Sequence, residues 1–188
     1  MSRTPSRMIP LGTLLPPFNL PDVVSGKIFS SGDLKSVHAS VIMFICNHCP
    51  FVKHVNSELV RLANDYKSRD VKFVAISSND AVHYPDDAPG KMKEAALSLA
   101  YPFPYLYDES QEVARSFDAA CTPDFYVFDS QQKLVYRGQL DDSRPSLDIP
   151  VTGKDIRLAL DGVLTGNPVS EMQRPSIGCN IKWKNQLA

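Results

Sequence analysis

Two cysteines three positions apart, Cys46 and Cys49, are the residues of this sequence best suited to chemistry. The apolar run 41–45 predicts a buried strand just before them, and an amphipathic stretch predicts a helix just after them. A thiol at the start of a helix lies near unpaired backbone N–H groups and the positive end of the helix dipole, and both favour the reactive thiolate. A second thiol three positions away can close a disulfide, so the pair is predicted to perform redox exchange.

The spacing of the pair is also found in half of a zinc site, which requires two further ligands at short spacing. Cys121 and Cys179 are single in the sequence. Redox chemistry is therefore favoured over zinc, and neither a metal nor a cofactor is expected. His48 lies between the two cysteines and could stabilise a thiolate as a cation or a hydrogen-bond donor, although it could also be an exposed turn residue.

Pro50 leaves two arrangements of the helix start open. If Cys46 caps the helix, Pro50 lacks the N–H that should bond back to the carbonyl of Cys46. If Cys49 caps the helix, Pro50 occupies the favoured first position and Cys49 receives the stronger dipole effect. Either cysteine can therefore be the attacking thiol.

The chain has 188 residues, of which 43% are hydrophobic and 22% charged, with a net charge of −1. This predicts one domain over residues 1–188, including a poorly ordered arm at 1–15 and a tail at 167–188 that packs on the domain. No basic block and no long apolar run is present, so neither nucleic acid nor a membrane is expected as a partner. Four cysteines without a convincing secretory signal predict a reducing, cytoplasmic location.

The alternation of apolar and amphipathic stretches predicts an α/β domain with a mixed central sheet. Strands are expected at 41–45, 71–76, 103–106, 124–129 and 133–138, and helices at 51–70, 91–100, 109–117 and 152–166. A small N-terminal hairpin is expected between residues 16 and 29. Asp108 is expected to cap the third helix, with Gln111 completing a capping box. The acidic pairs 86–87 and 141–142 are expected to be solvated loop charge.

Several segments resemble the peroxiredoxin-like group that carries a CxxC motif, within the redoxin and AhpC/TSA branch of the thioredoxin superfamily. They are residues 17–27, 46–54, 108–111, 121–124 and 176–183. The resemblance runs from about residue 10 to residue 184. It implies a thioredoxin fold, with a three-layer arrangement of helices on both faces of the sheet. It also implies a cis peptide bond before Pro123, where an ordinary trans proline is the alternative. In such a fold, Thr122 and Pro123 face the CxxC motif and keep backbone free for a substrate strand.

The resemblance also has departures that bear on activity. Aligning the peroxiredoxin pattern PxxxTxxC on Cys49 puts Cys46 in place of the threonine and Ile42 in place of the proline, and the peroxidase arginine is absent near Pro123. Thiol–disulfide exchange is therefore the favoured function. The alternatives are a thiol peroxidase, with Cys49 as peroxidatic and Cys46 as resolving cysteine, and a redox-inactive binding module. The implied partners are a protein or small-molecule disulfide, or a hydroperoxide, and a thioredoxin-type or glutathione-type reductant.

The tail 175–184 is expected to fold back over the domain, because Ile177, Ile181 and Trp183 gain from burial. It could then bring Cys179 near Cys121 or near the CxxC motif as an additional resolving thiol. The alternative is that Cys179 is an apolar contact on the far side, as lone cysteines usually are.

Overall fold

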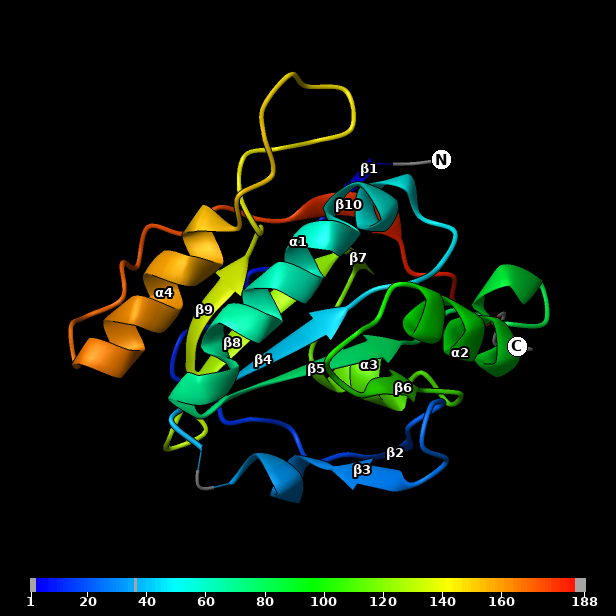
Figure 1. Cartoon of the computed structure of the whole chain (residues 1–188), viewed down its shortest axis with the longest axis horizontal. Coiled ribbons are helices and arrows are strands. Elements are labelled where there is room, and N and C mark those ends of the chain that lie inside the picture. The colour runs from blue at the N-terminus through cyan, green and yellow to red at the C-terminus, as the bar shows by residue number, and fades with distance from the viewer. Residues whose placement is uncertain (1–2, 36, 185–188) are drawn as a thin grey trace.

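The computed structural model describes residues 3–35 and 37–184, and its centre is a five-stranded mixed sheet (Figure 1). The strand order is β6-β5-β4-β8-β9. The parallel strands are β4 (Ala39–Phe44), β5 (Val71–Ser77) and β6 (Tyr105–Tyr107). The antiparallel strands are β8 (Asp124–Asp129) and β9 (Leu134–Gly138), which form the predicted hairpin.

Helices and loops cover both faces of this sheet. Alternate residues of β4 belong to two different apolar clusters, because successive side chains of a strand point to opposite faces. One cluster includes side chains of α1 (Pro50–Tyr66), α2 (Pro89–Ser98) and α4 (Lys154–Thr165). The other includes α3 (Glu112–Ser116), the hairpin of β2 (Asn19–Pro21) and β3 (Ile28–Ser30), and the short 3₁₀ helix η1 (Ser31–Leu34). The architecture is the predicted thioredoxin-like α/β fold.

A second sheet joins both ends of the chain to the middle, in the order β1-β10-β7 (Figure 1). Its strands are β1 (Arg3–Pro5), β10 (Ile177–Asn180) and β7 (Cys121–Thr122). The prediction of a poorly ordered arm over residues 1–15 is therefore wrong for β1, which pairs antiparallel with β10. Its order comes from main-chain hydrogen bonds rather than from an apolar pattern, so the sequence carries little sign of it.

Two details of the predicted helices are corrected. The helix predicted over 51–70 ends as α1 at Tyr66 and continues as a 3₁₀ turn, η2 (Lys67–Arg69), and a further 3₁₀ turn, η3 (Pro85–Asp87), precedes α2. α3 begins at Glu112 rather than at residue 109, because Gln111 adopts a left-handed conformation with φ 64°. Asp108 lies outside the helix but caps its first turn from a distance, whereas the side chain of Gln111 donates to the carbonyls of Ser78 and Lys182 and forms no capping box. The Asp108 carboxylate accepts hydrogen bonds from the Ser78 hydroxyl at 2.8 Å and the Ala114 N–H at 3.0 Å, and so ties the helix to the loop after β5.

The prediction that both acidic pairs are solvated is wrong for one residue in each pair. Asp87 is fully buried, and Asp141 is nearly so. The Asp141 carboxylate accepts the N–H groups of Thr152 at 2.6 Å and Gly153 at 2.7 Å, so it holds the segment that starts α4. A charge pair in a loop sequence does not reveal such partners, because they lie several residues away.

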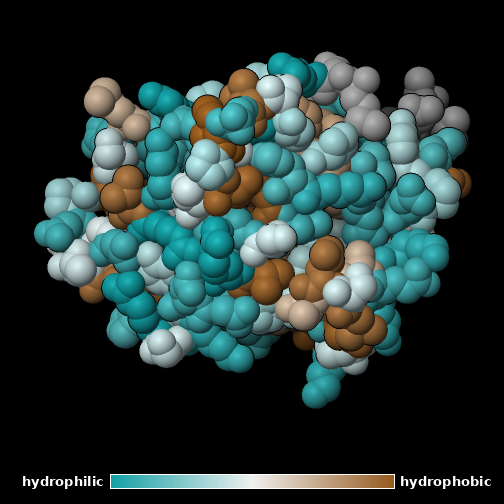
Figure 2. All heavy atoms as spheres, turned by 45° about the horizontal axis from the view of Figure 1, so that its top comes forward, coloured by the Kyte–Doolittle hydropathy of each residue, from teal (hydrophilic) through white to brown (hydrophobic). Residues whose placement is uncertain are grey.

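The surface is mostly hydrophilic on the face drawn in Figure 2, where brown apolar areas are separate rather than continuous. Of the tail side chains expected to be buried, Ile181 is covered, whereas Ile177 and Trp183 are each 37% exposed. Among residues 3–35 and 37–184, no helix has the length and apolar character needed to cross a membrane.

Candidate redox site

The helix start settles which cysteine receives the dipole effect. α1 begins at Pro50, and Cys49 is the residue that caps it, with extended backbone angles. Pro50 therefore occupies the first helical position, where its missing N–H costs no hydrogen bond. The carbonyl of Cys49 accepts the first helical bond, from the N–H of Lys53 at 3.0 Å. Cys49, rather than Cys46, lies at the positive end of the helix.

Both cysteines face the peptide between Thr122 and Pro123, which is cis as the resemblance implied. The Sγ of Cys46 lies 3.3 Å from the hydroxyl of Thr122. The Sγ of Cys49 lies 3.2 Å from the carbonyl oxygen of Thr122, to which a protonated Cys49 donates. Cys46 is 2% exposed and Cys49 is fully buried. The structure thus brings four predicted site residues into one cluster.

The two thiols have pKa values that are shifted in opposite directions. A hydrogen bond from Cys46 is the largest effect on Cys49 and lowers its pKa from 9.0 to about 5, helped by Cys179 and by the N–H of Val52 against the opposing effect of burial. The same hydrogen bond, together with burial, raises the pKa of Cys46 well above its ordinary value. The carbonyl of Thr122 repels a thiolate, so the donors on the other sides of Cys49 must outweigh it. Of the two cysteines, Cys49 is the one whose surroundings lower its pKa, whereas those of Cys46 raise it.

His48 is held by a buried carboxylate rather than left exposed in a turn. Its Nδ1 lies 2.6 Å from Oδ2 of Asp87, and its ring stacks on Tyr84 with 5.5 Å between centroids. The hydrogen bond with Asp87 is the main cause that raises the pKa of His48. Within the described residues no hydrogen bond joins His48 to either sulfur. Asp87 therefore holds His48 in place next to the two cysteines.

Asp87 is the functional residue that the sequence reasoning missed. Burial opposes its ionisation, but hydrogen bonds from His48 and Asn79 outweigh that effect, and the pKa of Asp87 is lowered. The amide of Asn79 donates to Oδ2 at 2.7 Å, and the N–H of Asn47 donates to Oδ1 at 2.8 Å. Asp87 therefore fixes the backbone of the CxxC loop as well as the imidazole. Its position, 38 residues after the second cysteine, offers no local signal of this role.

A metal ion would find three side chains of suitable type at this site. Ligand atoms of Cys46, His48 and Asp87 lie within 4.8 Å of one another. Both oxygens of Asp87 already accept hydrogen bonds, and its bond to His48 uses Nδ1. An ion bound by all three would have to displace these partners, so the arrangement fits a thiol pair better than a cation site.

The backbone expected to stay free for a substrate strand is occupied by the chain itself. β10 pairs antiparallel with β7, placing Cys179 opposite Thr122 and Asn180 opposite Cys121. Cys179 joins the apolar cluster that contains Cys46 and Cys49. Cys121 belongs to the opposite side of the strand, where its Sγ is 3.8 Å from the carbonyl of Pro123. Of the two auxiliary thiols, Cys179 is the one that shares an apolar cluster with the redox pair.

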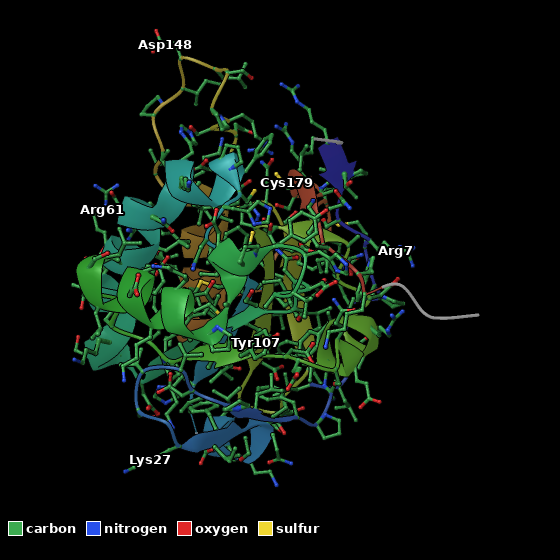
Figure 3. All side chains as sticks on the ribbon, turned by 90° about the vertical axis from the view of Figure 1, so that its right-hand side faces the viewer. Arg7, Lys27, Arg61, Tyr107, Asp148 and Cys179 are labelled. Carbon is green, nitrogen blue, oxygen red and sulfur yellow. The ribbon has the colours of Figure 1, made fainter. Side chains whose placement is uncertain are left out.

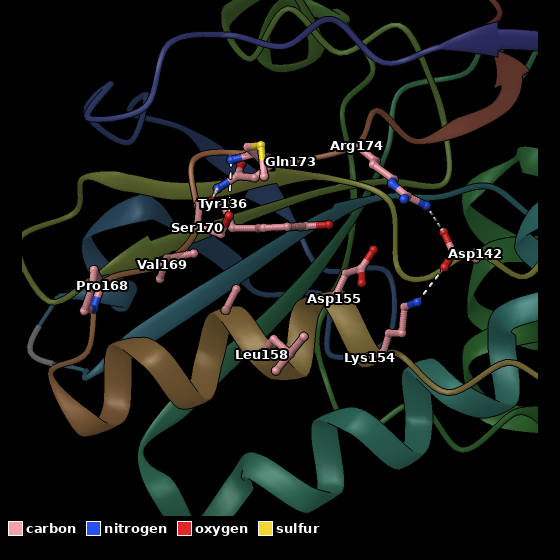
Figure 4. Close-up of a pocket in the computed structure, with 12 residues that line it drawn as sticks. Tyr136, Asp142, Lys154, Asp155, Leu158, Pro168, Val169, Ser170, Gln173 and Arg174 are labelled. Atoms are coloured by element: carbon pink, nitrogen blue, oxygen red, sulfur yellow. Dashed lines mark hydrogen bonds and ion pairs between the residues drawn. The ribbon is translucent and has the colours of Figure 1, made fainter.

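Two hollows on the surface differ in their relation to the thiols. One of about 660 Å³ is lined by His48, Tyr84 and Lys182 among others, and so opens beside the redox pair. The other, of about 530 Å³, lies between α4 and residues 168–174 (Figure 4). Neither hollow is lined by a cysteine, and Asp142 at the edge of the second pairs with Lys154 and Arg174. Of these two hollows, the first is the one lined by His48, which lies between the two cysteines in the chain.

Comparison with solved structures shows close relatives over nearly the whole chain. An uncharacterised conserved protein from Geobacillus kaustophilus is 63% identical with a TM-score of 0.97, and the alignment covers 99% of this chain and 98% of that one. A hypothetical protein from Sinorhizobium meliloti is 44% identical with a TM-score of 0.95, covering 97% and 100%. Comparison with curated proteins found no match.

A more distant structure carries a functional description. A thiol:disulfide interchange protein of the thioredoxin family from Chlorobium tepidum is 21% identical with a TM-score of 0.63, covering 81% of this chain and 97% of that one, which supports the fold. The family model described as AhpC/TSA matches residues 11–137. These residues include the redox pair and the cis proline but not Cys179. The chain belongs to the AhpC/TSA family.

Proposed function

We propose that this protein is a thiol–disulfide oxidoreductase in which Cys49 attacks and Cys46 resolves. The observation that carries the proposal is the position of Cys49 at the start of α1, where Cys46 donates a hydrogen bond to it and its pKa is lowered to about 5. Thiolate is the attacking form in disulfide exchange, and the lowered pKa of Cys49 favours that form at neutral pH.

The reaction balances with the two cysteines alone. The Cys49 thiolate attacks one sulfur of a substrate disulfide, the substrate S–S bond breaks, and one substrate thiol leaves. Cys49 then carries a mixed disulfide and no charge, so the main cause of the raised pKa of Cys46 is removed. Cys46 loses its proton, attacks Cys49 and releases the second substrate thiol. The protein ends with a Cys46–Cys49 disulfide, which a thioredoxin-type or glutathione-type reductant returns to two thiols.

The approach of a substrate is limited by the cover over the pair. Neither sulfur is open to solvent, and β10 occupies the strand edge beside Thr122. The hollow lined by His48, Tyr84 and Lys182 offers an approach on another side of the pair. A small-molecule disulfide, or a disulfide on a flexible segment, suits this entrance better than an extended strand of a folded protein.

The test is a disulfide reductase assay with three proteins. Wild-type protein should turn over a small disulfide, and Cys49→Ser should lose activity. Cys46→Ser should slow turnover but still become oxidised at Cys49, which mass spectrometry detects as a new disulfide on that residue. If the mixed disulfide instead accumulates on Cys46 in Cys49→Ser, the assignment of roles is wrong. If neither variant changes turnover, the proposed function fails.

A thiol peroxidase is the second candidate, favoured by the low pKa of Cys49, because peroxide is also attacked by thiolate. Against it, Cys46 stands where peroxiredoxins have a threonine, so the hydroxyl that would polarise the peroxide is replaced by a weaker donor. Parallel assays with a disulfide and a hydroperoxide, at equal enzyme concentration, separate the two candidates.

A further inference from the structure

At the redox site, β10 pairs with the edge of β7 to which a bound peptide could otherwise add as a strand. Two-residue β7 ends at the cis proline, and its outer edge is the kind of edge to which an extended peptide adds by β-pairing. In this chain the pairing partner is β10, whose residues come from the C-terminal tail and which is held on its other side by β1. Figure 3 shows Cys179 on β10 beside the start of α1. A segment of the protein is thus bound where a substrate segment would be.

The register puts a thiol at the point of this strand closest to the redox pair. Cys179 lies opposite Thr122, and Thr122 is the residue whose carbonyl contacts the Sγ of Cys49. Gly178 makes this close approach feasible, because a Cβ there would collide with the carbonyl oxygen of Thr122. Cys179 is 1% exposed and packs in the cluster that contains both redox cysteines. Cys49 therefore has a thiol neighbour on each of two sides, Cys46 within its loop and Cys179 on β10.

We propose that β10 is a built-in substrate strand whose Cys179 is a second resolving thiol, forming a Cys49–Cys179 disulfide. The proposal rests on the proposed function and adds a second way to resolve the mixed disulfide between Cys49 and the substrate. Cys179 loses its proton and attacks the sulfur of Cys49, the bond between Cys49 and the substrate breaks, and the substrate leaves as a thiol after taking up a proton. The substrate disulfide is the oxidant, and it gains the two electrons that the two cysteines lose.

In the reduced site, the raised pKa of Cys179 keeps this thiol protonated until Cys49 forms a mixed disulfide. Burial, followed by interaction with the Cys49 sulfur, raises the pKa of Cys179 to about 12. When Cys49 is joined to a substrate its charge is gone, so only burial still opposes ionisation of Cys179. The pKa of Cys46 falls for the same reason, and Cys46 is in the same loop as Cys49. Cys46 and Cys179 therefore compete to attack the sulfur of Cys49.

The experiment removes one competitor and identifies the disulfide that remains. Cys46→Ser protein is oxidised with a small-molecule disulfide, alkylated, digested without reductant and analysed by mass spectrometry. We expect a Cys49–Cys179 linkage in most of the oxidised protein. Adding Cys121→Ser, which changes the buried cysteine one position from Thr122, should leave this linkage in place. Adding Cys179→Ser should abolish it and leave the mixed disulfide on Cys49.

The outcomes separate this inference from the proposed function. A mixed disulfide on Cys49 that persists in Cys46→Ser, together with a Cys46–Cys49 disulfide in wild-type protein, overturns the inference and keeps the function. Absence of any oxidised Cys49 in both proteins overturns both. If Cys46→Ser does not fold, wild-type protein is oxidised with less than one equivalent of disulfide, and a measurable share of Cys49–Cys179 peptide is expected beside Cys46–Cys49. Its complete absence there also overturns the inference.

Discussion

Replacing Cys46 by alanine should raise the pKa of Cys49. In the structure the hydrogen bond from Cys46 is the largest contribution to the lowered value of about 5. A hydrogen bond to a charged group is worth roughly 1.5–3 kcal/mol, and one pKa unit corresponds to about 1.36 kcal/mol. Loss of the donor should therefore move the pKa of Cys49 up by roughly one to two units. Cys46→Ser keeps a donor of similar size and should move it less.

The assay is the pH dependence of alkylation at Cys49, read from its own peptide by mass spectrometry. The midpoint of the profile is used rather than the absolute rate, because burial slows reagent access in all variants. At pH 6 the thiolate fraction should fall from about 90% in the wild-type protein to roughly 10–50% in Cys46→Ala, given that only thiolate reacts. Cys121→Ala serves as the control for an unrelated buried cysteine.

Two outcomes would refute this reasoning. Equal midpoints in wild-type protein and Cys46→Ala would mean that Cys46 does not donate to Cys49. A midpoint near 9.0 in the wild-type protein itself would mean that the carbonyl of Thr122 and burial prevail over the donors, and that Cys49 is not held as a thiolate.

Three further predictions concern the strand, the histidine and peroxide. Gly178→Ala should lower the free energy of unfolding by about 1–3 kcal/mol in chemical denaturation, because the new Cβ collides with the carbonyl of Thr122. Gly90→Ala is the control, because a Cβ at that position meets no other atom and should not destabilise the protein. Equal denaturation midpoints for the two variants would contradict the close approach of β10. Because Asp87 raises the pKa of His48, protonated His48 stabilises the fold fully below its unfolded pKa near 6.5, and this contribution is lost as pH rises through the higher folded value. The stability difference between wild-type protein and His48→Gln should therefore shrink from pH 6 to pH 9, and a difference that grows would disprove the pairing. With hydrogen peroxide, the second-order rate constant measured by stopped flow should stay far below the diffusional ceiling of about 10⁸ M⁻¹s⁻¹, and a value near it would promote the peroxidase.

Much of the fold could be predicted from the sequence because its signals are local. The apolar run before Cys46 marks β4, and the periodic stretch after Cys49 marks α1. The turn at 130–132 marks the hairpin of β8 and β9. These patterns arise within a few residues of one another, from strand and helix periods, and they place the thiol pair at a strand-to-helix turn without any knowledge of distant contacts.

The remaining features were decided by tertiary structure. Pro50 allowed two helix starts, and the folded chain placed the cap at Cys49. Asp87 and Cys179 reach the site from 38 and 130 residues beyond Cys49, through a buried hydrogen bond and through strand pairing. Such contacts depend on which strand edges pair and which polar groups are buried together. Neither strand pairing nor burial of a polar group produces a periodic pattern in the sequence. The sequence by itself determined a thiol pair on a thioredoxin-like frame, whereas only the folded chain decided which thiol caps the helix and which residues surround it.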